Sequence, residues 1–111
     1  MAHRDSFAII PREEAFSIVK KFKNHLNKTG IVVQKMYLYG SYVKGNPHYG
    51  SDIDLCVISP SFQDRFEANL FLRREALKFD SRIEPVAYAP EQFEDWIPLA
   101  WEIKQTGVEI K

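Results

Sequence analysis

The segment from Gly40 to Lys44 has the composition of a turn that could hold an anion. Gly40 lets the backbone approach a ligand closely, and N–H groups at the start of a helical turn are free to donate to phosphate oxygens. The Ser41 hydroxyl adds a donor, and Lys44 adds a positive charge. Gly-Ser is also a common turn, and the Gly-Lys-Ser/Thr sequence of a P-loop is absent. Alone, this segment is weak support for a phosphate site.

Asp52 and Asp54 follow this turn and form a second group. They are two residues apart at the start of an apolar run, so in a strand both carboxylates point to one side while Ile53 and Leu55 point to the other. Two carboxylates this close repel each other unless a cation lies between them, and hard oxygen ligands of this kind suit Mg²⁺. The alternative is a pair of exposed turn residues. Burying unpaired acids at the head of an apolar strand is costly, which favours a metal site.

A third carboxylate is expected at such a site, because two divalent ions about 3.5–4 Å apart clamp the attacking and leaving oxygens of an in-line displacement. Glu84 is the candidate, since apolar residues of a predicted strand flank it; the alternative is a solvent-facing residue of an edge strand. Asp80 competes for this role but has the context of a loop after a helix. The histidines have no spacing that makes a zinc site (His3, His25 and His48).

The elements that must position these residues follow from the apolar periodicity. Pro11 opens a helix whose apolar residues recur at helical spacing, and Gly30 ends it. Strands are predicted over residues 31–39 and 53–58, with a short turn or helix over residues 41–44 between them. The second strand is apolar enough to be buried on both faces, which predicts a central position in the sheet.

A helix and a third strand are predicted next. Ser61 and Asp64 resemble a capping box at the start of a helix that runs to about Phe79. Residues 83–88 form a strand, and Pro85, which has no N–H to donate, favours an edge or bulged position there. The apolar residues that follow the helical period are Phe62, Phe66, Leu70 and Leu77.

The last part of the chain is predicted to be helical over residues 90–105, with a break near Pro98, and to end in a short strand over residues 108–110. The aromatic and aliphatic residues of this part are expected to pack in the core, although an exposed patch for another chain is the alternative (Phe93, Trp96, Ile97 and Trp101). The order of elements predicts an α/β (α+β) domain with a small mixed β-sheet backed by helices.

Length and composition suit one small domain. With 111 residues, 45% of them hydrophobic, the chain is expected to form a single domain over residues 1–111. The net charge is zero, so no stable nucleic-acid binding is expected. No apolar run approaches the roughly 20 residues that span a bilayer, and the start lacks the layout of a secretory signal, so a cytoplasmic protein without a membrane partner is expected. Cys56 is predicted to be a buried free thiol.

Taken together, the motifs resemble a known family. The combination of Gly40-Ser41, Lys44-Gly45 and the segment from Ser51 to Leu55 is similar to the signature of the polymerase-β-like nucleotidyltransferase superfamily. The size of the chain is similar to that of the minimal nucleotidyltransferases in this superfamily. The joint pattern is far more specific than either motif alone. The resemblance implies the polymerase-β-like nucleotidyltransferase fold for essentially the whole chain.

The resemblance also implies roles for individual residues. Asp52, Asp54 and Glu84 would be the catalytic carboxylates that bind two Mg²⁺ ions. Lys44 stands where arginine is frequent, so a point charge replaces a bidentate contact, and glutamate stands at position 84 where aspartate is more frequent. The residues expected to hold the nucleotide are Gly40, Ser41, Lys44 and Ser51.

The function implied by this resemblance is a Mg²⁺-dependent transfer of AMP from ATP to a hydroxyl acceptor. Minimal members are often encoded with a helical HEPN-type partner, so the expected acceptor lies on a HEPN-type toxin and the chain would be its antitoxin. One alternative is a non-catalytic, nucleotide-binding antitoxin. Another is a small-molecule nucleotidyltransferase of the antibiotic-modifying type that forms a homo-oligomer or works with a helical partner. A two-metal nuclease is less favoured, because no basic groove is evident.

Overall fold

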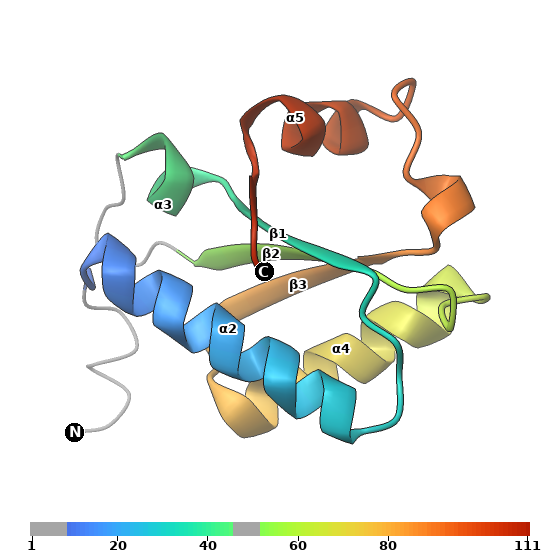
Figure 1. Ribbon diagram of the computed structural model, residues 1–111, viewed down its shortest axis with the longest axis horizontal. Helices are drawn as coiled ribbons and strands as arrows, with labels where there is room; N and C mark the ends of the chain where they lie inside the picture. Colours follow the sequence, from blue (N-terminus) through green and yellow to red (C-terminus); the bar gives the residue numbers. More distant parts are fainter. Residues whose placement is uncertain (1–8, 46–51) are drawn as a thin grey trace.

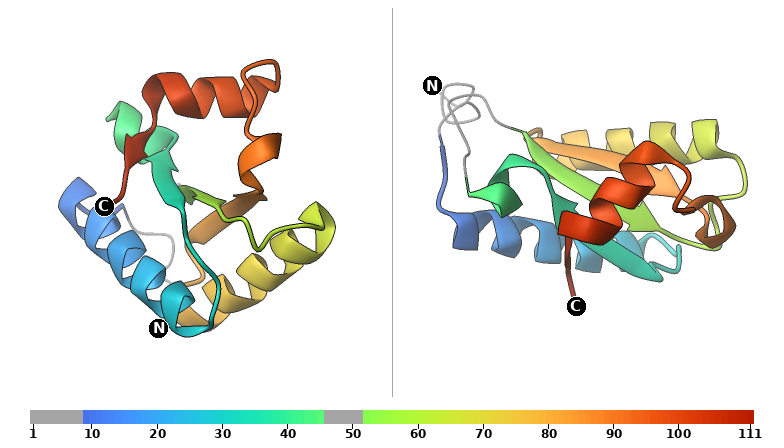
Figure 2. Two further views of the ribbon diagram at one scale, coloured as in Figure 1. Left: turned by 45° about the vertical axis from the view of Figure 1, so that its right-hand side comes forward. Right: turned by 90° about the horizontal axis from the view of Figure 1, so that it is seen from above.

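A computed structural model describes residues 9–45 and 52–111 of the chain (Figure 1). The described elements, in chain order, are α2 (Arg12–Lys28), β1 (Lys35–Tyr39), α3 (Ser41–Lys44), β2 (Ile53–Ile58), α4 (Arg65–Phe79), β3 (Ile83–Tyr88), the 3-10 helix η1 (Pro90–Gln92), α5 (Pro98–Thr106) and β4 (Val108–Glu109). Helices α2 and α4 cover one face of a four-stranded sheet, and α5 lies over the other (Figure 2). The predicted fold class, a small mixed sheet backed by helices, is confirmed.

Strand β2 lies inside the sheet, whose order is β3-β2-β1-β4. It runs antiparallel to β1 and parallel to β3, and β4 pairs antiparallel with β1. Its side chains alternate: Ile53, Leu55 and Val57 pack in the core with α2 and α4, whereas Cys56 and Ile58 pack with Ile103 of α5. The predicted central position of this strand and the predicted buried thiol are therefore confirmed.

Helix α2 begins and ends where the sequence predicts. Pro11 is its N-cap residue, and Glu13 and Glu14 in its first turn are stabilised by the positive end of the helix dipole. At the other end, the N–H groups of Thr29 and Gly30 donate to carbonyl groups of the last turn. Neither α2 nor any other helix of the described residues has the length and apolar character needed to cross a membrane.

Strand β1 is shorter than predicted, since it begins at Lys35 and not at residue 31. Lys35 is paired with Ile58, which is the last residue of β2. The N–H of Gln34 still donates to the carbonyl of Ile58 at 2.8 Å, but the residues before it have no strand to pair with. The β-branched residues of this segment predicted a longer strand because local composition does not report where the partner strand ends.

Helix α4 begins at Arg65, so the predicted capping box with Ser61 is wrong. The N-cap residue is Asp64, whose carboxylate accepts a hydrogen bond from the N–H of Glu67 at 3.1 Å. Phe62 is buried before the helix starts and does not set the helical phase. The apolar residues that kept the predicted period are therefore exposed (Phe66, Leu70 and Leu77), and the buried positions are others (Ala68, Leu72, Glu75 and Ala76).

Side chains of α4 close the outer edge of β3. The Oδ1 atom of Asn69 accepts a hydrogen bond from the N–H of Ala87 at 3.0 Å, and the Nε of Arg65 donates to the Ala87 carbonyl at 3.0 Å. Pro85, which has no N–H, lies in this edge strand, as predicted. These contacts fix α4 alongside β3 and hence beside the residues at the start of that strand.

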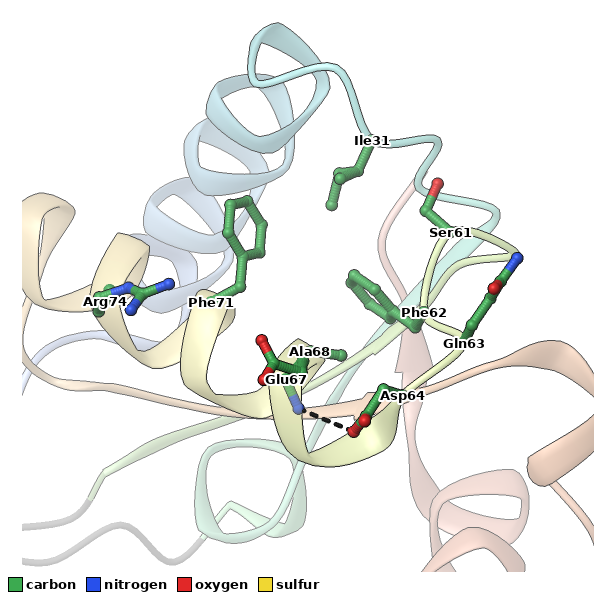
Figure 3. Close-up of a pocket in the computed structure, with 9 residues that line it drawn as sticks. All are labelled: Ile31, Ser61, Phe62, Gln63, Asp64, Glu67, Ala68, Phe71 and Arg74. Atoms are coloured by element: carbon green, nitrogen blue, oxygen red, sulfur yellow. Dashed lines mark hydrogen bonds between the residues drawn. The ribbon is translucent and has the colours of Figure 1, made fainter.

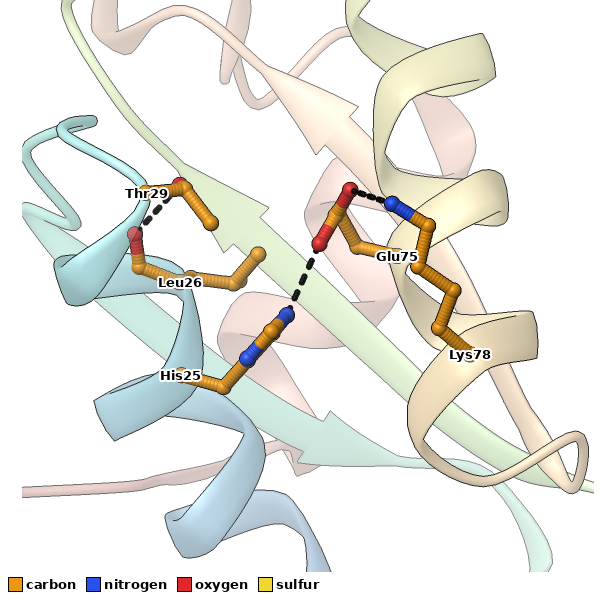
Figure 4. Close-up of polar contacts among 5 residues, drawn as sticks. All are labelled: His25, Leu26, Thr29, Glu75 and Lys78. Carbon is orange, nitrogen blue, oxygen red and sulfur yellow. Dashed lines mark hydrogen bonds and ion pairs between the residues drawn. The ribbon is translucent and has the colours of Figure 1, made fainter.

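A buried carboxylate joins α2 to α4 (Figure 4). Glu75 Oε1 lies 2.8 Å from Nε2 of His25, and Lys78 donates to Glu75 Oε2 at 3.1 Å. These hydrogen bonds, from His25 first and then from Lys78, hold the pKa of Glu75 below its ordinary value, although burial acts in the opposite direction. The His25 ring also packs against Phe22 and Phe79. The two helices that cover one face of the sheet are thus tied together.

The predicted break near Pro98 is confirmed, because Pro98 begins α5. The helix predicted before it is wrong except for the 3-10 helix η1, since residues 93–97 are not helical. Phe93 packs against the core residues on the α5 side of the sheet, which include Cys56, Ile58 and Ile103, as predicted. The prediction that Trp96 and Trp101 pack in the core is wrong, since 79% and 53% of their surfaces are exposed. Trp96 lies in the connection before α5, and α5 buries Ile103 instead of Trp101.

Candidate active site

The turn after β1 brings Gly40 against the carboxylate of Asp54. Tyr39 is paired with Asp54 across the two strands, so the next residue lies beside that side chain. Gly40 has a φ of 82° and a ψ of −152°, and a Cβ atom on it would overlap Oδ2 of Asp54. Glycine alone fits both the backbone conformation and the close contact. A predicted phosphate-binding residue and a predicted metal ligand are therefore neighbours.

Helix α3 continues directly from this glycine. The N–H groups of Val43 and Lys44 donate to the Gly40 carbonyl at 3.1 and 3.0 Å, which closes the helical turn that Ser41 begins. Tyr42 is buried, and its hydroxyl accepts a hydrogen bond from the N–H of Ile10 at 3.4 Å. The turn is thus anchored to the segment just before α2, and the Ser41 hydroxyl and its N–H lie one residue from the contact with Asp54.

Glu84 lies beside Asp54 in the sheet, because the two residues are register partners in the parallel pair of β2 and β3. Its carboxylate is held by α4: the Nη2 atom of Arg73 donates to Oε1 of Glu84 at 2.6 Å. The competing acid, Asp80, is paired with Arg82 at 2.8 Å. Burial would raise the pKa of Asp80, but the hydrogen bonds from Arg82 outweigh it and the pKa lies below its ordinary value.

Burial and the negative charges at this end of the sheet both act on Asp54. Burial, followed by the charges of Asp52, Glu84 and Glu102, raises the pKa of Asp54 to about 6, and Lys44 opposes this shift. Burial and the charge of Asp54 also raise the pKa of the neighbouring Tyr39 hydroxyl. Asp54 is therefore a half-buried carboxylate with more negative than positive charge around it.

Two residues of this cluster have no sequence motif to signal them. Glu102 comes from α5, and its Oε2 lies 3.5 Å from Nζ of Lys44. Arg73 comes from α4 and reaches Glu84. Both contacts join helices to strands and turns far away in the chain, and no local spacing pattern reports such contacts. Lys44, a predicted phosphate ligand, is thus held close to the carboxylates.

The donors at this site suit Mg²⁺, because they are carboxylate oxygens that carry uncompensated negative charge. In residues 9–45 and 52–111, no three His, Cys, Asp or Glu side chains come together as a preformed metal cluster. Asp52 and Asp54 fit a cation by their chemistry, whereas Glu84 would have to leave Arg73 to join them. Ser51, a predicted nucleotide ligand, lies outside the described residues.

A cavity of about 430 Å³ lies elsewhere, between the chain after α2 and the first turns of α4 (Figure 3). Phe62, Phe71 and Ile31 form its apolar wall, and polar side chains such as Arg74 stand at its rim. None of the candidate site residues lines this cavity. It follows β2 in the chain, whereas Asp52 and Asp54 stand at the other end of that strand.

Residues 18–105 match the family model described as the nucleotidyltransferase domain. This range contains every candidate site residue named above. A Methanocaldococcus jannaschii protein named "Putative protein adenylyltransferase" is 26% identical over 101 residues, which cover 87% of this chain and 99% of that protein.

Two solved structures are also similar. A crystal structure of a toxin–antitoxin with AMP-PNP has a TM-score of 0.61 and 26% identity, with 83% of this chain and 72% of the other covered. A mutant of the toxin–antitoxin MntA-HpeT has a TM-score of 0.60 and 25% identity, with 82% and 69% covered. The similarity thus extends over most of this chain in both cases.

Proposed function

Since the chain belongs to the nucleotidyltransferase domain family, we propose that it moves a nucleoside monophosphate, AMP from ATP, to a hydroxyl group. The acceptor oxygen forms a bond to the α-phosphorus, the bond to pyrophosphate breaks, and the hydroxyl proton is lost. The contact between Gly40 and Asp54 carries this proposal, because it joins an anion-binding turn to a carboxylate that can hold a cation. The choice of ATP is supported by the adenylyltransferase name of one relative and by the AMP-PNP in one similar structure.

The turn would hold the triphosphate. Backbone N–H groups at the start of α3 and the Ser41 hydroxyl would donate to phosphate oxygens, with Gly40 permitting close approach. Lys44 would exchange its ion pair with Glu102 for a phosphate, and Ser51 would add a further donor. Such contacts accelerate the reaction by positioning the α-phosphorus toward the acceptor, without a covalent intermediate.

The carboxylates would hold two Mg²⁺ ions, with Asp52 and Asp54 as ligands and Glu84 as the third. Bound Mg²⁺ supplies positive charge for the attacking and leaving oxygens and eases loss of the hydroxyl proton. Glu84 stands in the edge strand β3, beside Asp54 of the inner strand β2. Its carboxylate would orient the acceptor hydroxyl and draw its proton.

The acceptor in this proposal is a hydroxyl side chain of a partner protein, a helical HEPN-type toxin for which the chain is the antitoxin. Two observations support it. One relative is named as a protein adenylyltransferase, and similar structures come from toxin–antitoxin pairs. Partner modification would then be the means by which the toxin is neutralised.

A second candidate is a nucleotide-binding antitoxin that does not catalyse. The ion pair between Arg73 and Glu84 favours it, because the third carboxylate is already engaged by a guanidinium. The two candidates differ in one measurable respect, which is whether the nucleotide leaves the protein as a covalent product.

The test is incubation with α-labelled ATP, Mg²⁺ and a helical partner protein. We expect label in the partner, lost in Asp54→Asn. The matched control is Asp64→Asn, which removes the same charge but keeps a side chain that caps α4 well. Label on a small alcohol instead would show a small-molecule acceptor, and nucleotide binding without any transfer would show the non-catalytic candidate.

A further inference from the structure

Helix α4 presents an apolar stripe that nothing in the described residues covers. Phe66, Leu70 and Leu77 are 71%, 41% and 63% exposed. Together with Arg73 they occupy positions i, i+4, i+7 and i+11, so all four lie along one face of the helix. Isolated exposed apolar residues are ordinary, but a stripe of three on one helix face is typical of an interaction surface.

The charges beside this stripe are mostly positive. Arg73 lies on its β3 side, where it pairs with Glu84, and Arg74 and Lys78 are exposed on the same helix. Glu67 is exposed among them, whereas Glu75 is buried against α2. The face therefore matches a surface that is apolar along its centre and acidic along its flanks.

The spacing of the apolar residues on this face of α4 indicates the kind of partner that can bind there. Apolar residues at helical spacing along a helix are complementary to a second amphipathic helix with the same spacing. A second copy of this chain is disfavoured, because two α4 faces would bring arginines together. RNA is disfavoured as well, since base stacking needs aromatic rings, and of these three apolar residues Phe66 alone supplies one.

The stripe is also continuous with the candidate active site. Arg73 lies on the same helix face as the stripe and donates to Glu84, and Glu84 is the register partner of Asp54. A carboxylate on the docked helix would compete for the Arg73 guanidinium and release Glu84 toward Asp54. The ion pair is half-exposed, so its loss changes affinities by only about two- to fivefold.

We propose that the outer face of α4 docks an amphipathic helix with acidic flanks, presented by a protein partner, and that Arg73 links this docking to Glu84. The link rests on the proposed function, whereas the docking does not.

The probe is a synthetic helical peptide with leucines at i, i+4, i+7 and i+11 and glutamates on both sides; a matched peptide carries lysines in place of the glutamates. Binding to the full chain is followed by backbone NMR shifts. We expect the acidic peptide to shift α4 signals and the lysine peptide to bind at least about tenfold more weakly. Arg73→Glu with Arg74→Glu should reverse this preference, and Leu70→Glu should abolish binding of both peptides.

The control is Trp101→Ser, which removes an exposed apolar side chain from α5 and should leave peptide binding unchanged. Circular dichroism confirms that each variant is folded. Equal binding of the two peptides, or no effect of Leu70→Glu, would overturn the docking surface. A concentration-dependent dimer lost in Leu70→Glu would assign the face to a second copy, and tighter binding of a single-stranded RNA would assign it to nucleic acid; either result overturns the proposal.

The link to Glu84 has its own readout. The acidic peptide should strengthen Mg²⁺ binding, measured by calorimetry without nucleotide, by about two- to fivefold. Arg73→Gln should bind Mg²⁺ as tightly without the peptide and gain nothing from it. Unchanged Mg²⁺ affinity in both experiments would refute the link. If peptide docking persists while ATP binding and transfer are absent, the proposed function fails and the docking surface stands.

Discussion

Replacing Gly40 by alanine tests whether the close contact with Asp54 is what assembles the site. The backbone at this position has a φ of 82° and a ψ of −152°, a conformation that other residues adopt at a cost of about 1–3 kcal/mol. The new Cβ would also overlap Oδ2 of Asp54 and push that carboxylate away. We expect the free energy of unfolding in urea to fall by about 2–3 kcal/mol, and Tm to fall by about 4–8 °C for each kcal/mol.

The effect on transfer should exceed the effect on stability. Displacing a reacting group by about 1 Å can cost about a hundredfold in rate, so labelled product from α-labelled ATP should fall at least that far in Gly40→Ala at a temperature where the variant is folded. Gly45→Ala is the matched control, because Gly45 has the same φ of 82° but an added Cβ would meet nothing within 4 Å. Equal transfer activity in the two variants would refute the role given to this contact.

The other predictions concern charge and the edge of the sheet. Because burial raises the pKa of Asp54 to about 6, its stabilising contribution is greatest at acid pH and is lost as the pH rises through about 6; carboxyl NMR should find this titration in metal-free protein, and Mg²⁺ should move it lower. A titration that Mg²⁺ leaves in place would contradict the metal-ligand role. Glu75→Gln should lower the free energy of unfolding at neutral pH by about 1–3 kcal/mol. The difference in stability between wild type and variant should vanish as the pH falls through the depressed pKa of Glu75. A difference that does not depend on pH would exclude the hydrogen-bonded carboxylate as its cause. Asn69→Ala should cost about 1–2 kcal/mol and speed amide exchange at Ala87, whereas unchanged exchange would show that this hydrogen bond does not protect the edge.

Much of the fold could be predicted because local signals and tertiary structure agree. The strand over residues 53–58 is predicted correctly, since an apolar run suits the strand with a neighbour on each side. The helix between Pro11 and Gly30 is predicted correctly because its apolar stripe is also its buried face. In α4 the local pattern and the buried face disagree: Leu72, Glu75 and two alanines are buried, whereas the apolar residues at the predicted spacing, such as Leu70, face outward.

The candidate site was predictable only in part. A strand, a turn and a strand bring Gly40 and Asp54 together, so their contact follows from short-range sequence. The register that puts Glu84 beside Asp54 depends on a crossover through α4, and the strand context of Glu84 was its single local indication. Arg73 and Glu102 were missed, because helix packing decides which exposed charged side chain reaches the site.

The outer edge of β3 also affects how the chain behaves at high protein concentration. A sheet recruits a foreign strand through unpaired backbone groups on its last strand, and stacking of that kind seeds cross-β fibrils. Here Pro85 offers no donor, and both backbone groups of Ala87 are already engaged by Arg65 and Asn69. At Pro85 and Ala87 this edge therefore gives an incoming strand no N–H donor, and the carbonyl of Ala87 is also engaged.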